Sequence, residues 1–240
     1  MTQNPDDVGS TFARGWTLLS QNPVIVVPGL VLGAIGGIAI AAVVLAFIGS
    51  VIATGATHSV AVGATSLGLT TAAGIVLILA LTVVQTTATT AMAVAAWERG
   101  STTLADAWAA LSLRGWQMLA AVVLLFFIGC AALLLAPFTL LVSLLAYVIF
   151  FMYVAPSVVE GRPAGEAIAE SCRLAARNLG PSAGIAVLVM VISVIAGIVG
   201  SEIGRVELFF GGLAAAALQQ AAVAYAIVVI VGEYRKLRNQ

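Results

Sequence analysis

A serine between two glycines is the first feature of this sequence that could do chemistry. Gly180-Pro181-Ser182-Ala183-Gly184 has the Gly-x-Ser-x-Gly spacing of a nucleophile elbow, in which a histidine base activates the serine. That elbow needs a strand before the serine, whereas an amphipathic helical pattern precedes Ser182 and an apolar segment follows it. The only histidine, His58, falls in a polar loop expected on the other side of a membrane. We therefore expect a helix end here, no catalytic residue and no enzyme.

The same histidine is the only ordinary nitrogen ligand for a metal. No second His, Cys or carboxylate lies near His58 in the sequence, although metal sites bring several such ligands together. We interpret His58 as a solvated loop residue, and we expect no metal site and no cofactor.

Glutamines and threonines are the deepest polar groups of the apolar segments. Gln85 lies near the middle of one segment beside Thr86 and Thr89, and Gln219 and Gln220 lie near the middle of the last segment. Because their depths match, we expect Gln85 to contact one of the other two glutamines. This centre has two interpretations: interhelical hydrogen bonds worth about 0.6 kcal/mol each, or a polar binding site or path.

Glycines recur in the first apolar segment, where Gly29, Gly33 and Gly37 are spaced four residues apart. Small residues at this spacing let two membrane helices approach closely. We expect this surface to pack against other helices of the same chain rather than to form a dimer.

Charged residues and tryptophans gather outside the apolar segments. Glu98 and Glu160 each end such a segment, and we expect each to pair locally with an arginine such as Arg99 or Arg162, or to reach headgroup water. The residues that we expect at a cytoplasmic interface are Arg14, Trp16, Glu98, Trp108, Arg114, Glu160, Arg173 and Arg177.

The composition explains why the charges gather. Of the 240 residues, 62% are hydrophobic and 8% are charged, whereas soluble domains carry about 25% charged residues. No charge occurs between Arg14 and Glu98, a length that allows two crossings of about 20 residues each. We predict an all-α integral membrane protein with six transmembrane helices in three hairpins, the second of which turns at Pro137. The predicted segments are 23–50, 67–97, 116–136, 138–158, 182–200 and 208–231.

The basic residues predict the orientation of these segments. Nine of the ten Lys and Arg residues fall on one side of the six segments, and only Arg205 falls on the other. The positive-inside rule then predicts a multi-pass protein of the plasma (inner) membrane with both termini in the cytoplasm. All four tryptophans fall at this cytoplasmic boundary, which indole rings favour.

A short amphipathic pattern precedes each hairpin, and we expect three surface helices on the cytoplasmic side. In the third, we expect Glu166, Glu170, Arg173 and Arg177 on the charged face. The apolar faces contain Phe12, Trp16 and Leu19; Leu104, Trp108 and Leu111; and Ile168, Cys172, Ala175 and Leu179. The chain is predicted to be a single membrane domain over residues 1–240, divided into residues 1–66 and 67–97 for the first unit, 98–158 for the second and 159–240 for the third.

Three stretches carry a resemblance to a known family: FARGWTLLSQNPVIVVPGLVLG, AWERGSTTLADAW and FMYVAPSVVEGRPAGEAIAESCRLAARNLG. They resemble the six-helix membrane domain found fused ahead of some bacterial glycerophosphodiester phosphodiesterases, and its stand-alone relatives of unknown function. The resemblance implies a six-helix bundle. It implies no activity, because catalysis in the fused proteins belongs to a separate soluble domain.

These observations favour one function and leave a second open. We expect a non-catalytic membrane module that binds membrane lipids or a cytoplasmic protein partner through its surface helices. The alternative is a transporter or channel for a small or amphiphilic solute, using the Gln/Thr centre. No charged residue lies deep in a predicted segment, which disfavours an ion-coupled pump. A net charge of zero gives no reason to expect nucleic-acid binding, and the oligomeric state stays open.

Overall fold

The structure, a computed structural model, describes residues 8–57, 60–139, 142–206 and 210–239 as a helical chain. His58 lies outside these residues. The elements are α1 (Val8–Gln21), the 3-10 helix η1 (Pro23–Val26), α2 (Val27–Thr57), α3 (Val60–Arg99), α4 (Leu104–Leu135), α5 (Val142–Phe151), α6 (Val154–Val159), α7 (Ala164–Arg177), α8 (Leu179–Val206) and α9 (Phe210–Arg238).

Six stretches within the described residues are long and apolar enough to cross a membrane, with mean hydropathies from 2.0 to 2.9. They are Pro23–Gly49, Gly68–Arg99, Leu104–Leu135, Val142–Val159, Leu179–Arg205 and Gly211–Arg238. The predicted all-helical class and the six apolar segments are therefore confirmed, although several ends differ.

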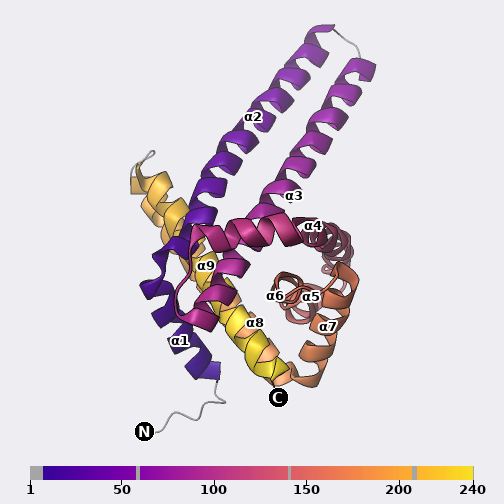
Figure 1. The fold of residues 1–240 in the computed structure, drawn as a ribbon. Helices are drawn as coiled ribbons and strands as arrows, with labels where there is room; N and C mark the ends of the chain where they lie inside the picture. The colour runs from indigo at the N-terminus through magenta and orange to yellow at the C-terminus, as the bar shows by residue number, and fades with distance from the viewer. Residues whose placement is uncertain (1–7, 58–59, 140–141, 207–209, 240) are drawn as a thin grey trace.

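Helices that follow one another in the chain pack together. α2 lies along α3, α8 lies along α9, and α4 contacts both α3 and α5. Figure 1 shows α2 and α3 running side by side away from the rest of the molecule. The described start of α1 and the end of α9 lie at the opposite end from the tips of α2 and α3.

The second predicted surface helix is not separate from the segment that follows it. α4 runs without interruption from Leu104 to Leu135 and covers both. A single glycine, Gly115, costs a helix only about 1 kcal/mol relative to alanine and does not end it. At the start of α4, Thr103 and Asp106 form a capping box in which Asp106 Oδ2 accepts a hydrogen bond from the Thr103 backbone N–H at 2.8 Å.

The fourth apolar segment is broken. α5 ends at Phe151 and α6 begins at Val154, so Met152 and Tyr153 separate two short helices. Pro156 explains the break, because proline has no N–H to donate to the carbonyl four residues earlier and its ring crowds that carbonyl. The Ser171 hydroxyl of α7 enters the gap, where it accepts from the Tyr153 N–H at 3.2 Å and donates to the Phe150 carbonyl at 2.7 Å.

Two further helix ends lie elsewhere than predicted. α8 begins at Leu179, before the expected stop at Gly180-Pro181, because proline is compatible with the first turn of a helix. The α4–α5 turn does lie at Pro137, as predicted, with Phe138 N–H bonded to the Leu135 carbonyl. α9 continues past Val231 to Arg238, so the basic residues near the C-terminus belong to a helix.

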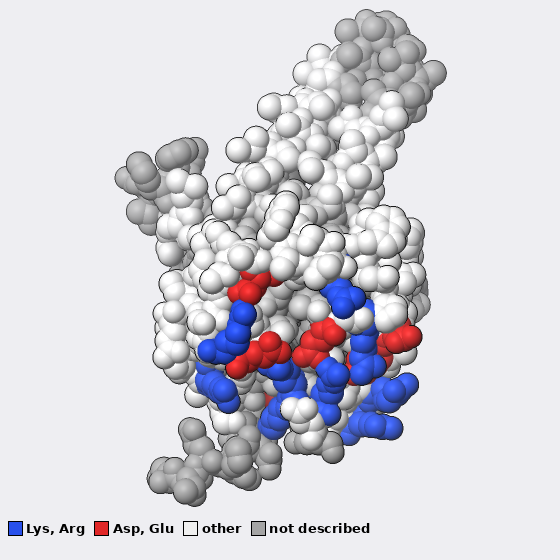
Figure 2. All heavy atoms as spheres, in the orientation of Figure 1, with Lys and Arg blue, Asp and Glu red and all other residues white. Residues whose placement is uncertain are grey.

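The tightly packed core lies toward one end of the molecule. Ile25, Met92 and Val228 are fully buried and lie in one cluster. In contrast, much of α2 and the early part of α3 expose large apolar side chains. Figure 2 shows acidic and basic side chains gathered over the end where α1 begins and α9 ends, while the projecting α2–α3 arm is free of them on this face. We call this the charged end; it includes Arg14, Glu98, Glu160, α7 and the last turns of α9.

Candidate functional site

The glutamines at the predicted polar centre do meet. Gln85 Nε2 of α3 donates a hydrogen bond of 2.8 Å to Gln220 Oε1 of α9, which confirms the expected contact. Gln219 does not share this bond, and its own side-chain oxygen is buried without a hydrogen-bond partner among the described residues. The centre therefore joins two helices that are 135 residues apart in the chain.

Glycines of α2 enclose this glutamine pair. A Cβ added at Gly29 would lie 2.5 Å from Gln220 Oε1, and one added at Gly33 would lie 3.0 Å from Gln220 Nε2. The expected close approach is present at these two glycines, and it occurs within the chain. It is absent at Gly37, where an added Cβ would have no described atom within 4 Å.

The threonines near the centre divide into two groups. Thr82 and Thr87 bond backward to carbonyls of their own helix, at 2.8 and 2.7 Å. Thr89 is buried, and its hydroxyl has no hydrogen-bond partner in the described part of the chain; Thr86 is half-buried. Polar atoms at this centre thus have unused bonding capacity beside the Gln85–Gln220 bond.

Glu98 and Glu160 pair with arginines of the last helix, so the expected pairing with a neighbouring arginine was wrong. Arg235 Nη2 donates to Glu98 Oε1 at 2.8 Å, Arg235 Nε lies 3.7 Å from Glu160 Oε1, and Arg238 Nη1 bonds Glu160 Oε2. These four residues border a cavity of about 350 Å³ at the charged end. Sequence reasoning missed both partners because it placed them in a tail, whereas α9 carries them to the two glutamates.

Arg99 and Arg162, the expected local partners, bind other carboxylates. Arg99 Nη2 lies 2.7 Å from Asp106 Oδ1 at the start of α4. Arg162 Nε lies 2.5 Å from Glu170 Oε2. Arg99 therefore connects the end of α3 to the start of α4, and Arg162 connects the α6–α7 turn to α7.

Glu170 is buried, which corrects its predicted place on the charged face of α7. Its side chain is 8% exposed, and Oε2 accepts a hydrogen bond of 2.5 Å from the Ser157 hydroxyl as well as the Arg162 contact. The Tyr234 hydroxyl lies 3.5 Å from the same oxygen. The α7 face that packs inward contains Ala164, Ala167, Glu170, Ser171 and Ala175. Of the predicted apolar face, Ala175 is buried as expected, Ile168 and Cys172 are only half-buried, and Leu179 is exposed at the start of α8.

A second buried carboxylate, Glu233, went unnoticed in the sequence. It is 0% exposed, and Oε2 accepts a hydrogen bond of 2.9 Å from Thr11 of α1. Lys236 Nζ lies 3.7 Å from Oε1, which has no hydrogen-bond partner among the described residues. The available signal was positional: Glu98 and Glu160 lie at the end of the first and second hairpins, and Glu233 lies near the end of the third.

Trp97 and Arg14, both predicted at the cytoplasmic boundary, contact each other beside α9. Trp97 packs over Gly232, where any Cβ would collide with the indole ring, and its Nε1 donates to the Val228 carbonyl at 2.7 Å. The Arg14 guanidinium carbon lies 4.8 Å from the Trp97 ring centroid, which is a cation–π contact. Arg14 thus caps an interhelical contact between α3 and α9.

The remaining predicted interface residues lie on the surface or near it. Trp16 and Trp108 are 63% and 72% exposed. Arg114 is half-buried and packs against Gly161, whose φ of 110° favours glycine. Arg173 and Arg177 are exposed on α7 and form no ion pair with the described carboxylates.

Ser182 lies within a helix, and both cysteines are unpaired. Ser182 is buried in the first turn of α8, not after a strand, and lies 3.1 Å from the Tyr153 hydroxyl. Cys130 and Cys172 are both free thiols. Burial raises the pKa of the half-buried Cys172 thiol.

One family model matches this chain, over residues 7–234, and its description is Domain of unknown function (DUF7847). Comparisons with curated proteins and with solved structures found no match. The matched range contains every described helix in whole or in part, including both buried glutamates and the Gln85–Gln220 pair. The chain therefore belongs to the family described as Domain of unknown function (DUF7847).

Proposed function

We propose that the protein is a non-catalytic module of the plasma membrane that binds anionic lipid headgroups through α7 at a cytoplasmic charged end. In this proposal the six apolar stretches cross the membrane as three hairpins, α2–α3, α4–α5/α6 and α8–α9. The packing of each pair supports the hairpins. The bias of basic residues toward one side supports cytoplasmic termini.

The observation that carries the proposal is the unpaired basic face of α7. Most other described arginines at the charged end already contact a carboxylate or an aromatic ring, as Arg235, Arg162 and Arg14 do. Arg173 and Arg177 point two exposed charges outward with no acidic neighbour in ion-pair range among the described residues. Their charges are therefore available to an external anion, and each contributes about 1 kcal/mol near an anionic leaflet.

The test replaces both arginines with glutamine. Losing about 2 kcal/mol lowers the affinity for anionic lipid roughly 30-fold, measured by native mass spectrometry of protein from bilayers of defined phosphatidylglycerol content. The matched control is Arg99→Gln with Arg205→Gln, which removes the same charge from arginines that acidic side chains already neutralise. Equal lipid recovery from both double variants would contradict the proposal. Loss of a co-purifying protein instead of lipid would identify a protein partner, in line with the resemblance to domains fused ahead of phosphodiesterases.

The Gln/Thr centre keeps a transporter or channel as the second candidate. The observation in its favour is the group of buried oxygens without partners, on Thr89, Thr90 and Gln219. Against it, Gly29 and Gly33 pack directly on Gln220, which indicates a helix contact. Gln85→Leu should leave solute flux in reconstituted vesicles unchanged if the centre only joins helices, and should alter it if the centre is a path.

A further inference from the structure

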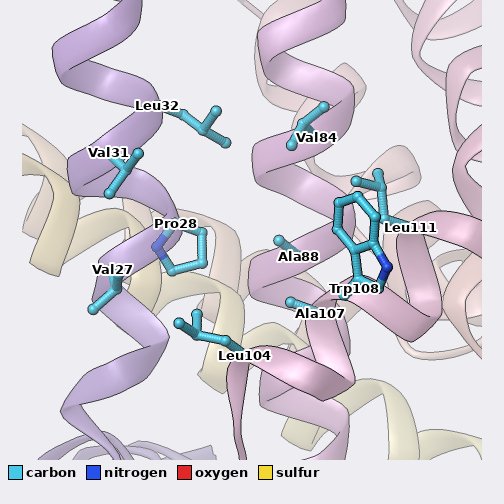
Figure 3. Close-up of a pocket in the computed structure, with 10 residues that line it drawn as sticks. All are labelled: Val27, Pro28, Val31, Leu32, Val84, Ala88, Leu104, Ala107, Trp108 and Leu111. Carbon is cyan, nitrogen blue, oxygen red and sulfur yellow. The ribbon is translucent and has the colours of Figure 1, made fainter.

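Two apolar pockets lie between a helix that begins one predicted unit and the helix pair of another. The first, the Trp108 pocket, has a volume of about 350 Å³ and lies between α4, α2 and α3. Figure 3 shows Val31 on α2, Val84 and Ala88 on α3, and Trp108 with Leu104 on α4 around it. The side chains that line it are all apolar apart from the indole N–H.

The second pocket, the Trp16 pocket, has a volume of about 450 Å³ and lies between α1, α8 and α9. Trp16 borders it from α1, Ile195 from α8, and Leu218, Ala221 and Tyr225 from α9. The Tyr225 hydroxyl is already bonded to the Phe12 carbonyl at 3.1 Å, so this lining is also effectively apolar.

Each pocket reaches a similar distance along its long helix from a glutamate of the charged end. Val84 lies fourteen residues before Glu98, and Leu218 lies fifteen residues before Glu233. At a rise of 1.5 Å per residue, both residues are about 20 Å along their helices from the glutamates of the charged end. That height corresponds to the hydrocarbon region of a bilayer whose headgroups meet the charged end.

We infer that each pocket binds one acyl chain of a membrane phospholipid. Trp16 and Trp108 are 63% and 72% exposed, and the nearby Val31 and Ile195 are 52% and 55% exposed, so the rims face outward. An apolar, outward-facing hollow at hydrocarbon depth excludes charged and sugar-like ligands, because their polar groups would be buried without partners. Both volumes fall in the range of about 300–1,000 Å³ for ligand pockets. The inference rests on the proposed membrane insertion, but not on the role of the α7 arginines.

The third unit does not repeat the tryptophan. Ile168 occupies the place in α7 that Trp16 and Trp108 occupy in their helices, and it is partly buried against a cluster that contains Met118 and Val158. Ile168 therefore packs against the protein, whereas Trp16 and Trp108 border pockets. From the two pockets described above, we expect two retained chains.

Brominated lipid provides the test, because bromine on an acyl chain quenches tryptophan that touches it. Three variants each keep only Trp16, Trp108 or Trp116, with phenylalanine at the other three tryptophans. Each is placed in vesicles of phosphatidylcholine with dibrominated chains and then exchanged into detergent with no lipid added. Trp116 is the matched control, since it is 77% exposed on the same helix as Trp108 but lines neither pocket.

We expect all three tryptophans to be quenched in vesicles, and Trp16 and Trp108 alone to stay at least half quenched in detergent. Val84→Phe should release the quenching of Trp108 only, and Ala221→Phe that of Trp16 only, so each variant is the folding control for the other. If Val84→Phe does not fold, Val31→Phe at the exposed rim replaces it.

Four outcomes would overturn the inference. Recovery of all three tryptophans in detergent would exclude retained chains, and persistent quenching of Trp116 would indicate a general lipid coat. Retained quenching by a brominated fatty acid, but not by the phospholipid, would assign a free acid instead. Absence of quenching even in vesicles would count against membrane insertion, and hence against the proposed function. The zwitterionic lipid keeps the result independent of Arg173 and Arg177.

Discussion

The substitution Glu170→Gln tests most directly whether Glu170 is buried, as in the structure, or exposed, as the sequence pattern predicts. The pattern places Glu166 and Glu170 on one charged face of α7, one helical turn apart. The structure exposes Glu166 and buries Glu170 against Ser157 and Arg162. Neutralising each glutamate by the same chemical change should therefore give two different results.

The expected loss follows from the contacts of Glu170 Oε2. Hydrogen bonds to a charged group contribute about 1.5–3 kcal/mol each. Glutamine has the same size and can still accept a hydrogen bond from the Ser157 hydroxyl. The substitution therefore removes the extra strength that the negative charge gives this bond, but not the bond itself. Arg162 is 37% exposed, and water replaces part of its ion pair. We expect Glu170→Gln to lower the free energy of unfolding by about 2 kcal/mol, which corresponds to a Tm lower by roughly 4–8 °C for a chain of this length.

The assay heats detergent-purified protein and measures the fraction that remains monodisperse by size-exclusion chromatography. Glu166→Gln is the control, and an exposed substitution should change stability by less than about 0.5 kcal/mol. The double variant with Arg162→Gln should lose less than the sum of the single losses, because both residues share one interaction. Equal Tm values for the Glu166 and Glu170 variants would refute the burial argument.

Two further predictions concern orientation and packing. In a Cys130→Ala background, a membrane-impermeant maleimide should label Cys172 in inverted vesicles and not in intact cells. The reaction is run at pH 8.5 because the raised pKa of this thiol makes labelling slow at neutral pH. Labelling from outside would reverse the proposed topology. Gly232→Ala should lower the free energy of unfolding by about 1–3 kcal/mol, because the added Cβ would collide with the Trp97 ring. Gly212→Ala on the same helix is the control and should not lower it, because a Cβ there meets no described atom within 4 Å. Equal thermal stability of the two variants would contradict this contact.

The sequence predicts the long helices well because their signal is local. Twenty or more apolar residues in a row indicate a spanning helix whatever they touch, and Pro137 indicates the turn between α4 and α5. The failures occur where two local signals compete. A separate surface helix was expected before the segment at 116–136, but α4 runs through both. The segment at 138–158 was expected to be continuous, but it is broken between α5 and α6, shortly before Pro156.

The candidate sites were predicted less completely because their contacts join distant parts of the chain. The match in depth between Gln85 and Gln220 was readable, since position along a spanning helix fixes height. The direction in which a helix faces was not readable, so Glu170 was placed outward. The partner of Glu98 lies 137 residues away on α9, and local spacing could not identify it.

The ends of the three predicted units explain why those partners come from α9. After Glu98 and Glu160 the chain turns at Gly100 and Gly161, which have φ values of 77° and 110°. Glycine adopts such backbone angles with no steric cost from a side chain, so it ends a helix readily. No such glycine follows Glu233 directly, and α9 continues to Arg238.

The longer last helix gives the third unit a contact role that the other two units lack. If α9 ended where the other two helices end, Arg235 and Arg238 would not be held on a helix beside Glu98 and Glu160. Because it continues, both arginines reach the two glutamates that follow the first and second hairpins, Glu98 and Glu160. Glu233, the corresponding glutamate of α9, is instead bound by a hydroxyl from α1. The last turns of α9 therefore connect all three units at the charged end, and the carboxylates there are largely neutralised from within. The outward basic face of α7, with Arg173 and Arg177, is therefore the part of this end that we propose binds a lipid headgroup.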